Sequence, residues 1–312
     1  MDIKHVLREH PEWLDHLESV GPVDVRFPHD LLGELLRLAV PHEDIGGVLA
    51  GLPAPGDPHW WLLERCVGSL VASMGDTEAP PRFPELPELG PYFYVHVYLA
   101  ALPYTRAYHR EHGIPEHVAQ ATLADLGRNM AVHRKRFRAP GLHAPFWFML
   151  HARGMIYQLG RLQFERSLMR EGTASGVRAA GMDPGDGNPA LDVHIPDFCG
   201  PMDPASCDRS FARAAEFFPR HFPKEKYLVA TCHSWLLDEQ LARYLPEGSN
   251  IIAFQRRFHL LHRFETGVLG FVFGADAEAD PLPRRSSLER AIADHLAEGG
   301  SWYGRAGWLR LS

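Results

Sequence analysis

The chain has few cysteines and no long apolar run. Its four cysteines, at positions 66, 199, 207 and 232, are widely spaced and form no CxxC pair, so a fold built on disulfides is not expected. No stretch of about 18 apolar residues occurs, and the first ten residues lack the apolar core of a secretory signal. We therefore expect a cytoplasmic protein with no membrane-spanning helix.

Basic charge is not in excess either. The 32 Lys and Arg residues are outnumbered by 39 Asp and Glu residues, and the net charge of −7 provides no field that would attract nucleic acid. The sequence also contains no GxSxG, P-loop or GxGxxG motif. Hydrophobic residues are abundant. They make up 45% of the 312 residues, which is enough for a full core and for two domains.

The first half of the chain has helical periodicity. Leucines at positions 31, 32, 35, 36 and 38 fall on one helical face, and Pro- and Gly-rich stretches separate this segment from later ones of the same kind. The predicted helices are 27–39, 60–74, 92–112, 115–137 and 146–159. We therefore predict a helical N-terminal domain over residues 1–158.

The second half alternates strand-like and helix-like segments. Strands are predicted at 160–166, 191–195, 227–232, 250–254, 268–273 and 302–311. Helices are predicted at 206–222, 236–244 and 286–298, and the Gly- and Pro-rich stretch 172–189 is predicted to be a loop. We predict one sheet with helices around it over residues 159–312, which makes the whole chain α+β or α/β.

The stretch YLVATCHSW at 227–235 is predicted to be a mostly apolar strand that ends in residues with reactive or hydrogen-bonding side chains. Ligands of open sheets bind where strands end. Because side chains alternate along a strand, Thr231 and His233 face one side, while Cys232 and Ser234 face the other. Cys232 is either a nucleophile or a small buried hydrophobe. Ser234 is either a hydrogen-bonding group of the site or the cap of the next helix.

Asp192 and His194 stand two apart on the strand predicted at 191–195, so their side chains share one face. A neutral imidazole at a strand end can act as a general base, and a nearby carboxylate would orient it. We predict that His194 is a base oriented by Asp192. The alternative is a surface histidine beside a surface aspartate.

Arg284 and Arg285 immediately precede a predicted helix start. Ser286 and Glu289 form a capping-box pattern, which places the start of the helix there. Guanidinium groups, free amide donors and the helix dipole together attract an anion, and a cofactor pyrophosphate would suit them. The alternative is an ordinary capped surface helix with solvated arginines.

Three histidines raise the question of a metal. His109 and His112 have a helical spacing compatible with two metal ligands, and His117 is close in sequence. However, no HExxH pattern is present, and Arg106 and Arg110 oppose a cation. We predict a solvated helix face, and no metal is expected.

Five segments together resemble the signature of a bacterial acyltransferase-domain family. They are GRLQFE at 160–165, VHIP at 193–196, CHSWLLD at 232–238, SNII at 249–252 and PRRSSLERA at 283–291. Members of this family join a helical N-terminal N-acyltransferase domain to a GNAT-like C-terminal domain. The resemblance therefore implies an α+β protein, in which a GNAT-like mixed β-sheet flanked by helices follows the helical domain.

The resemblance also implies transfer of an acyl group from acetyl-CoA or another acyl-CoA to an amine acceptor, by direct attack in a ternary complex. The chain departs from the superfamily because it lacks an RxxGxG/A pyrophosphate loop; the half-match at 178–183 lacks the last small residue. The CoA pyrophosphate is therefore expected at the other anion site. The residues implied there are Arg284, Arg285, Ser286 and Ser287.

Such a reaction needs a base, a group that polarises the thioester carbonyl and a proton for the leaving thiolate. His194 or His233 is expected to be the base. Ser234 or a backbone amide is expected to polarise the carbonyl. Cys232 or Tyr227 would reprotonate the thiolate.

Two other functions fit the same residues. An acyl-CoA decarboxylase or thioester hydrolase on a GNAT-like fold would use His194 or His233 with Ser234. A non-catalytic module that binds an acyl group or a partner protein would explain the missing pyrophosphate loop. The partners expected for the acyltransferase are an acyl-CoA and a small-molecule amine, with no nucleic acid and no membrane; a homodimer stays open.

Overall fold

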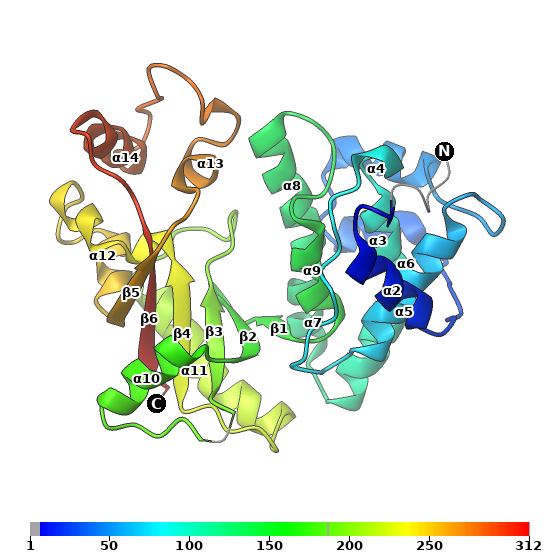
Figure 1. The fold of residues 1–312 in the computed structure, drawn as a ribbon, viewed down its shortest axis with the longest axis horizontal. Helices are drawn as coiled ribbons and strands as arrows, with labels where there is room; N and C mark the ends of the chain where they lie inside the picture. The colour runs from blue at the N-terminus through cyan, green and yellow to red at the C-terminus, as the bar shows by residue number, and fades with distance from the viewer. Residues whose placement is uncertain (1–6, 186, 312) are drawn as a thin grey trace. The chain divides into compact units, whose positions relative to one another are not determined.

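The computed structural model describes residues 7–185 and 187–311, which form two compact units (Figure 1). The helical unit comprises the described residues up to Arg134 together with Ala139–Tyr157. The sheet unit comprises Lys135–Arg138 and the described remainder of the chain. The α+β class predicted from the sequence is confirmed, because helices form the first unit and a mixed sheet lies in the second.

The helical unit contains the helices α2 to α9. Their bounds are α2 Pro11–Ser19, α3 Leu31–Arg37, α4 His42–Ala50, α5 Trp60–Ala72, α6 Phe93–Glu111, α7 Glu116–Leu123, α8 Asp125–Phe137 and α9 Pro145–Ala152, with a 3₁₀ turn, η1, at Pro87–Leu89. The single helix predicted at 115–137 is divided at Ala124 into α7 and α8.

The helix predicted at 146–159 is shorter than expected. α9 ends at Ala152, and Gly154 then adopts a left-handed backbone with φ of +70°. A glycine tolerates this conformation without steric cost, so it favours the end of a helix. The chain continues as strand β1, Ile156–Gln158.

α6 is the central core helix of its unit. The side chains of Val95, Val97, Leu99, Ala100 and Ala101 are all 0% exposed, although they point in different directions around the helix axis. A helix that is apolar on all sides must be surrounded by other elements. This burial explains why the periodicity of the segment identified a helix without marking a single apolar face.

A charged pair joins α3 to α6 inside this unit. Glu34 is 1% exposed, and its two carboxylate oxygens accept hydrogen bonds from both terminal nitrogens of Arg106, one of them at 2.9 Å. Arg37 donates to the same carboxylate at 3.2 Å. Burial raises the pKa of Glu34, but the two arginines outweigh it, so the pKa lies below its ordinary value. The carboxylate is therefore charged and depends on its partners.

His109 contradicts the prediction of a solvated face, because it is only 1% exposed on α6. Among the described residues, neither of its ring nitrogens has a hydrogen-bond partner. Burial, followed by the charges of His112 and Arg106, lowers the pKa of His109 to about 4. A proton on this ring would thus be a buried, uncompensated charge.

This burial predicts a specific loss of stability in acid. The unfolded chain takes up a proton at His109 near pH 6.5, whereas the folded chain does so near pH 4. The contribution of the neutral ring to the free energy of unfolding is therefore complete above pH 6.5, and it is lost as the pH falls from 6.5 toward 4. The contribution lost between pH 7 and pH 5 is about 2 kcal/mol. His109→Leu should remove this part of the pH dependence in urea unfolding curves. His117→Leu, on the surface of the same unit, is the control; equal pH dependence in wild type and His109→Leu would contradict the assignment.

The sheet unit is built on a mixed sheet, in which the five strands next to β1 follow the order β2-β3-β4-β6-β5. Their bounds are β2 Gln163–Leu168, β3 Pro189–His194, β4 Val229–Ser234, β5 His259–Phe264 and β6 Gly304–Arg310. β3 and β4 are parallel, and the other neighbouring pairs are antiparallel. The two parallel strands therefore end at the same edge of the sheet.

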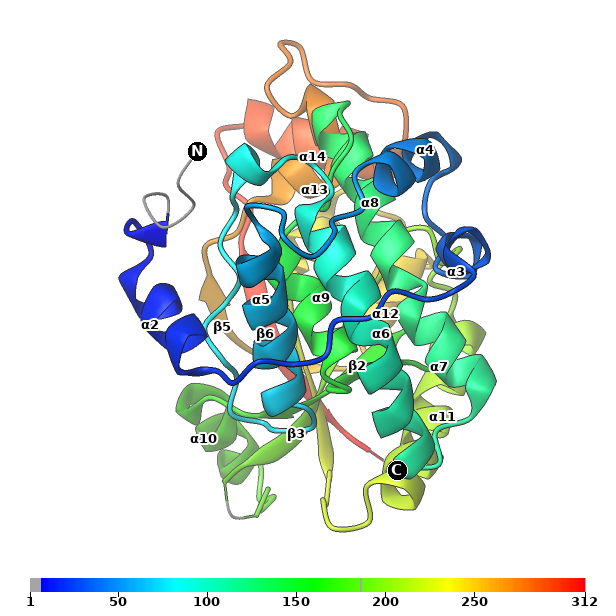
Figure 2. The same ribbon diagram turned by 90° about the vertical axis from the view of Figure 1, so that its right-hand side faces the viewer.

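Two helices cover the two faces of this sheet. Ala174 and Val177 of α10, Glu171–Ala179, pack with Ala190, Val229 and Trp308. On the other face, Phe211 of α11, Pro204–His221, meets Phe164 with ring centroids 5.6 Å apart. Figure 2 shows α10 and α11 on opposite sides of the strands.

The remaining elements of the sheet unit are short, apart from α14. They are η2 Trp235–Leu237, η3 Glu239–Arg243, α12 Asn250–Gln255, α13 Val268–Val272, η4 Gly274–Asp276 and α14 Ser287–Ala297. No helix in residues 7–185 and 187–311 combines the length and the apolar character needed to cross a membrane.

Several predicted elements of this unit are wrong. The strands predicted at 250–254 and 268–273 are the helices α12 and α13, and the loop predicted at 172–189 contains α10. Ser249 caps α12 by accepting a hydrogen bond from the amide of Ile252 at 3.3 Å. The helix predicted at 236–244 consists of 3₁₀ turns, and β5 was not predicted.

Candidate active site

Five polar side chains lie on one face of three neighbouring strands. They are Glu165 on β2, Asp192 and His194 on β3, and Thr231 and His233 on β4. Glu165 is paired with Asp192, and Asp192 with Thr231, so the register puts these three directly across from one another. We call this set the polar row.

The polar row follows from strand alternation. Ala190 and Val229, two positions before Asp192 and Thr231, point to the same face and are buried with α10. α10 therefore covers the first part of this face. The polar side chains lie further along the strands, toward the carboxyl ends of the parallel strands β3 and β4. Ligands of open sheets bind at such ends.

His194 is held by a carboxylate, but not by the one predicted. Its Nε2 lies 2.8 Å from Oε2 of Glu165, and both side chains are about one-fifth exposed. Asp192 instead contacts residues of β4. The register explains this contact: Glu165 pairs with Asp192 and is the diagonal cross-strand neighbour of His194, and diagonal neighbours are within reach of long side chains. The orienting group of His194 is therefore Glu165.

A second histidine–carboxylate pair lies beside the first. Oδ1 of Asp192 accepts a hydrogen bond from Thr231 Oγ1 at 3.0 Å and lies 3.3 Å from Nδ1 of His233. Burial raises the pKa of Asp192, but the hydrogen bond from His233 and the charges of His194 and His233 outweigh it, so the pKa lies below its ordinary value. Asp192 is therefore a carboxylate at neutral pH.

Cys232 is not brought to this face. Its side chain is 0% exposed on the opposite side of β4, and burial raises the pKa of its thiol well above the ordinary value. The burial fits the second of its two interpretations, a small buried hydrophobe, and gives no support to the predicted catalytic role. Tyr227, the other predicted acid, donates its hydroxyl hydrogen to Glu225, and burial raises its pKa as well.

Ser234 also points away from the polar row. Its hydroxyl oxygen accepts a hydrogen bond from the amide of Leu236 at 3.1 Å and caps η2. Of the two interpretations of Ser234, the structure shows the cap. His194 and His233 are thus the predicted catalytic residues that the structure places on one face.

The predicted capping box at α14 is confirmed. Ser286 Oγ accepts from the amide of Glu289 at 3.0 Å, and Oε2 of Glu289 accepts from the amide of Ser286 at 3.1 Å and from that of Arg285. Arg284 pairs with Asp294. The Glu289 carboxylate therefore occupies part of the position where an external anion would bind; Ser287 is the first residue of the helix.

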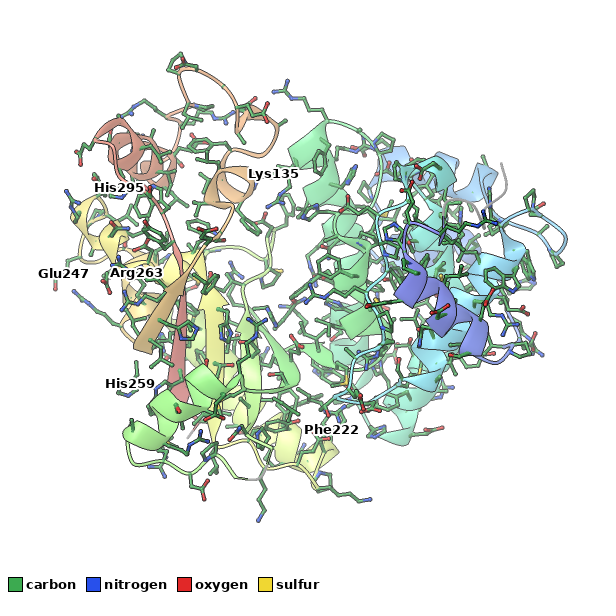
Figure 3. The ribbon with its side chains drawn as sticks, in the orientation of Figure 1. Lys135, Phe222, Glu247, His259, Arg263 and His295 are labelled. Atoms are coloured by element: carbon green, nitrogen blue, oxygen red, sulfur yellow. The ribbon has the colours of Figure 1, made fainter. Side chains whose placement is uncertain are left out.

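A cavity of about 370 Å³ lies in front of this helix end. Its lining consists of Lys135, Arg138, Val272, Phe273, Ala275, Asp276, Arg285 and Glu289. Lys135, labelled in Figure 3, lies beside α13, with its Nζ 3.4 Å from the carbonyl oxygen of Phe271. Asp276 binds Arg138 at 2.6 Å and Arg285 at 3.3 Å. Three cations against two carboxylates leave the lining with one excess positive charge.

Among the described residues, three members of the polar row could be considered as metal ligands. One ligand atom each from Glu165, Asp192 and His194 lies within 4.8 Å of the others. Hydrogen bonds between these carboxylates and the two histidines explain the same arrangement without an ion. Glu165 was the one member of the row that the sequence did not single out. Its signals were the alternation of polar and apolar residues in 160–166 and its place in the segment GRLQFE at 160–165.

Comparison with known proteins supports the resemblance seen in the sequence. The chain matches the N-acyltransferase N-terminal domain over residues 29–154 and the GNAT-like C-terminal domain over residues 156–309. A search of curated proteins found no match.

Solved structures resemble the chain over its whole length. An acyltransferase in complex with decanoyl-CoA is 38% identical, with a TM-score of 0.87 and 100% of both chains covered. An acyltransferase in complex with decanoyl-CoA and teicoplanin, and one in complex with CoA and 10C-Teicoplanin, are each 36% identical at the same TM-score and coverage. The chain belongs to the acyltransferase family in which an N-acyltransferase N-terminal domain precedes a GNAT-like C-terminal domain.

Proposed function

We propose that this protein transfers a decanoyl-like acyl group from acyl-CoA to an amine of a teicoplanin-type glycopeptide. The observation that carries the proposal is the full-length similarity, at 36–38% identity, to acyltransferases bound to decanoyl-CoA and to teicoplanin. The polar row supports it, because amide formation needs proton-transfer groups, and the two histidines of the row are partly exposed. The acceptor is then larger than the small molecule expected from the sequence.

The chemistry we propose is direct attack in a ternary complex. His194, oriented by Glu165 at 2.8 Å, removes a proton from the acceptor nitrogen as that nitrogen bonds to the thioester carbon. The carbon–sulfur bond then breaks, and its electron pair leaves on the CoA sulfur. Burial of the Cys232 thiol supports this route, since this thiol is not placed to form an acyl-enzyme intermediate.

The test is to incubate the protein with decanoyl-CoA and a deacylated teicoplanin-type glycopeptide and to follow both products. A glycopeptide heavier by one decanoyl group, formed together with an equal amount of free CoA, is the expected result. Free CoA released equally well without an acceptor would favour a thioester hydrolase. Carbon dioxide released from malonyl-CoA would favour a decarboxylase.

A binding measurement separates the enzyme from a non-catalytic module. Decanoyl-CoA at about 100 times its Kd should stabilise the protein by about 2.7 kcal/mol, which is a rise in Tm of about 5 °C. Stabilisation without any product in the acylation assay would support the binding module. If decanoyl-CoA gave no stabilisation and no product, the protein would not be one that binds or uses acyl-CoA.

For the cofactor, we propose that the CoA phosphates bind at the cavity in front of α14, through Lys135, Arg138 and Arg285 and the amide of Ser287. The excess positive charge of the lining supports this assignment. The ion pairs of Arg285 with Asp276 and Glu289 oppose it, because a phosphate has to compete with them.

Substituting these cations should weaken acyl-CoA binding specifically. Arg285→Ala and the double substitution Lys135→Ala/Arg138→Ala are each expected to raise the KM for decanoyl-CoA about fivefold to tenfold, with kcat nearly unchanged. Arg284→Ala is the matched control, because Arg284 pairs with Asp294 and is not among the residues that line the cavity in the described part of the chain. If all three variants keep the wild-type KM, the phosphates bind elsewhere.

A further inference from the structure

We propose that His233, positioned by Asp192, returns a proton to the departing CoA thiolate, so that two adjacent histidine–carboxylate pairs divide the proton transfers of one reaction. Asp192 is then a positioning residue, and Thr231 holds Asp192 in place. The inference rests on the proposed acyl transfer.

The hydrogen bonds fix which nitrogen of His233 can do this work. Asp192 is ionised, so it has no hydrogen to donate, and Nδ1 of His233 must be the donor in their contact at 3.3 Å. Nε2 is then the atom that gains and loses a proton. The bond from Thr231 to the same oxygen, at 3.0 Å, keeps the carboxylate from turning away from His233.

The two pairs are adjacent but engage opposite ring nitrogens. β3 and β4 are parallel with Asp192 beside Thr231, so the same register carried two residues further puts His194 beside His233. Neighbouring strands are about 4.8 Å apart, which is close enough for both rings to reach one bound thioester. His194 meets Glu165 through Nε2, whereas His233 meets Asp192 through Nδ1. The two rings are therefore turned differently toward their carboxylates, as two groups with different tasks would be.

The proton balance needs two such groups. One proton leaves the acceptor nitrogen for His194 when the carbon–nitrogen bond forms. His233 enters the step as the imidazolium, and its Nε2 proton passes to sulfur when the carbon–sulfur bond breaks. The products are an amide and a neutral thiol, and both imidazoles are restored by exchange with water. The side chain of His233 is 28% exposed, which permits that exchange. The burial of Cys232 and the bond of Tyr227 to Glu225 remove the two other groups considered for the acid.

The test uses two acyl donors that differ only in the leaving thiol: decanoyl-CoA, and a decanoyl thioester of thiophenol, whose more acidic thiol departs without a proton. Asp192→Asn and His233→Gln are expected to lower kcat/KM about 100-fold with decanoyl-CoA and less than fivefold with the aryl thioester. His194→Gln should lose activity with both donors. Asp208→Asn, which alters a carboxylate paired with Arg257 on the surface of α11, should keep the wild-type rate with both.

Thr231→Val is the control for misfolding, because it keeps the shape of the side chain and removes only the hydrogen bond to Asp192. It should lose about fivefold with decanoyl-CoA and nothing with the aryl thioester. Equal losses with both donors in Asp192→Asn and His233→Gln would overturn the acid role while leaving acyl transfer in place. A wild-type protein that acylates the glycopeptide with neither donor would instead remove the proposed function on which the inference rests.

Discussion

His194→Gln is expected to lower kcat/KM for acyl transfer by about 1,000-fold, within the range that general-base catalysis contributes. Glutamine keeps a polar side chain on β3 but cannot take a proton from an ammonium or amine at neutral pH. Because His194 is partly exposed, the substitution should leave the free energy of unfolding nearly unchanged. Acylation rates by mass spectrometry and urea unfolding of the same sample measure the two effects.

Two companion variants sharpen this experiment. Glu165→Gln leaves the imidazole in place but removes the negative charge that orients it at 2.8 Å, so we expect a smaller loss of about 10-fold. His262→Gln replaces an exposed histidine of β5 and should be silent. If His194→Gln retained more than a tenth of the wild-type rate, His194 would not be the base.

The largest expected effect on stability concerns the buried Glu34. Arg106→Met should lower the free energy of unfolding by about 3 kcal/mol, because it leaves a carboxylate that is 1% exposed with Arg37 as its only remaining arginine partner among those described. Chemical unfolding followed by circular dichroism measures the change. The acylation site should be unaffected when activity is assayed well below the unfolding transition.

A double-mutant cycle separates the ion pair from packing. Glu34→Leu/Arg106→Met replaces both charges by apolar groups, and it should be less destabilised than the single Arg106→Met variant. Arg110→Met, on the exposed side of the same helix, is the control for losing an arginine from α6. A double variant that is as unstable as the sum of the two single variants would show that packing, and not the buried charge, causes the loss.

The parts of the fold that could be predicted are those with a local physical cause. The capping box of Ser286 and Glu289 marked the start of α14, and the apolar run before Cys232 marked β4. The segments now seen as α12 and α13 were misassigned because four to six consecutive apolar residues fit a strand and a buried helix equally well. Which one forms depends on the cap at Ser249 and on packing against distant residues.

The same distinction applies to the site. Alternation along one strand correctly put Thr231 and His233 on one face and Cys232 on the other, and it put Asp192 beside His194 on a single face. It could not show that Glu165, 29 positions earlier, is the residue that meets His194. That contact depends on the register between β2 and β3, which arises from long-range pairing and has no local signature.

The residues of the polar row lie on strands, whereas the connections between strands contain the residues that can vary more freely. The opposite face of these strands is core, where Phe164, Val193 and Cys232 are at most 2% exposed. Substitutions on the strands therefore threaten folding, whereas the connection after β3 begins beside His194, and its residues 195–201 are partly or fully exposed. Over evolutionary time, and in directed evolution, this segment is where a new acyl length or a new acceptor can be selected without rebuilding the chemistry.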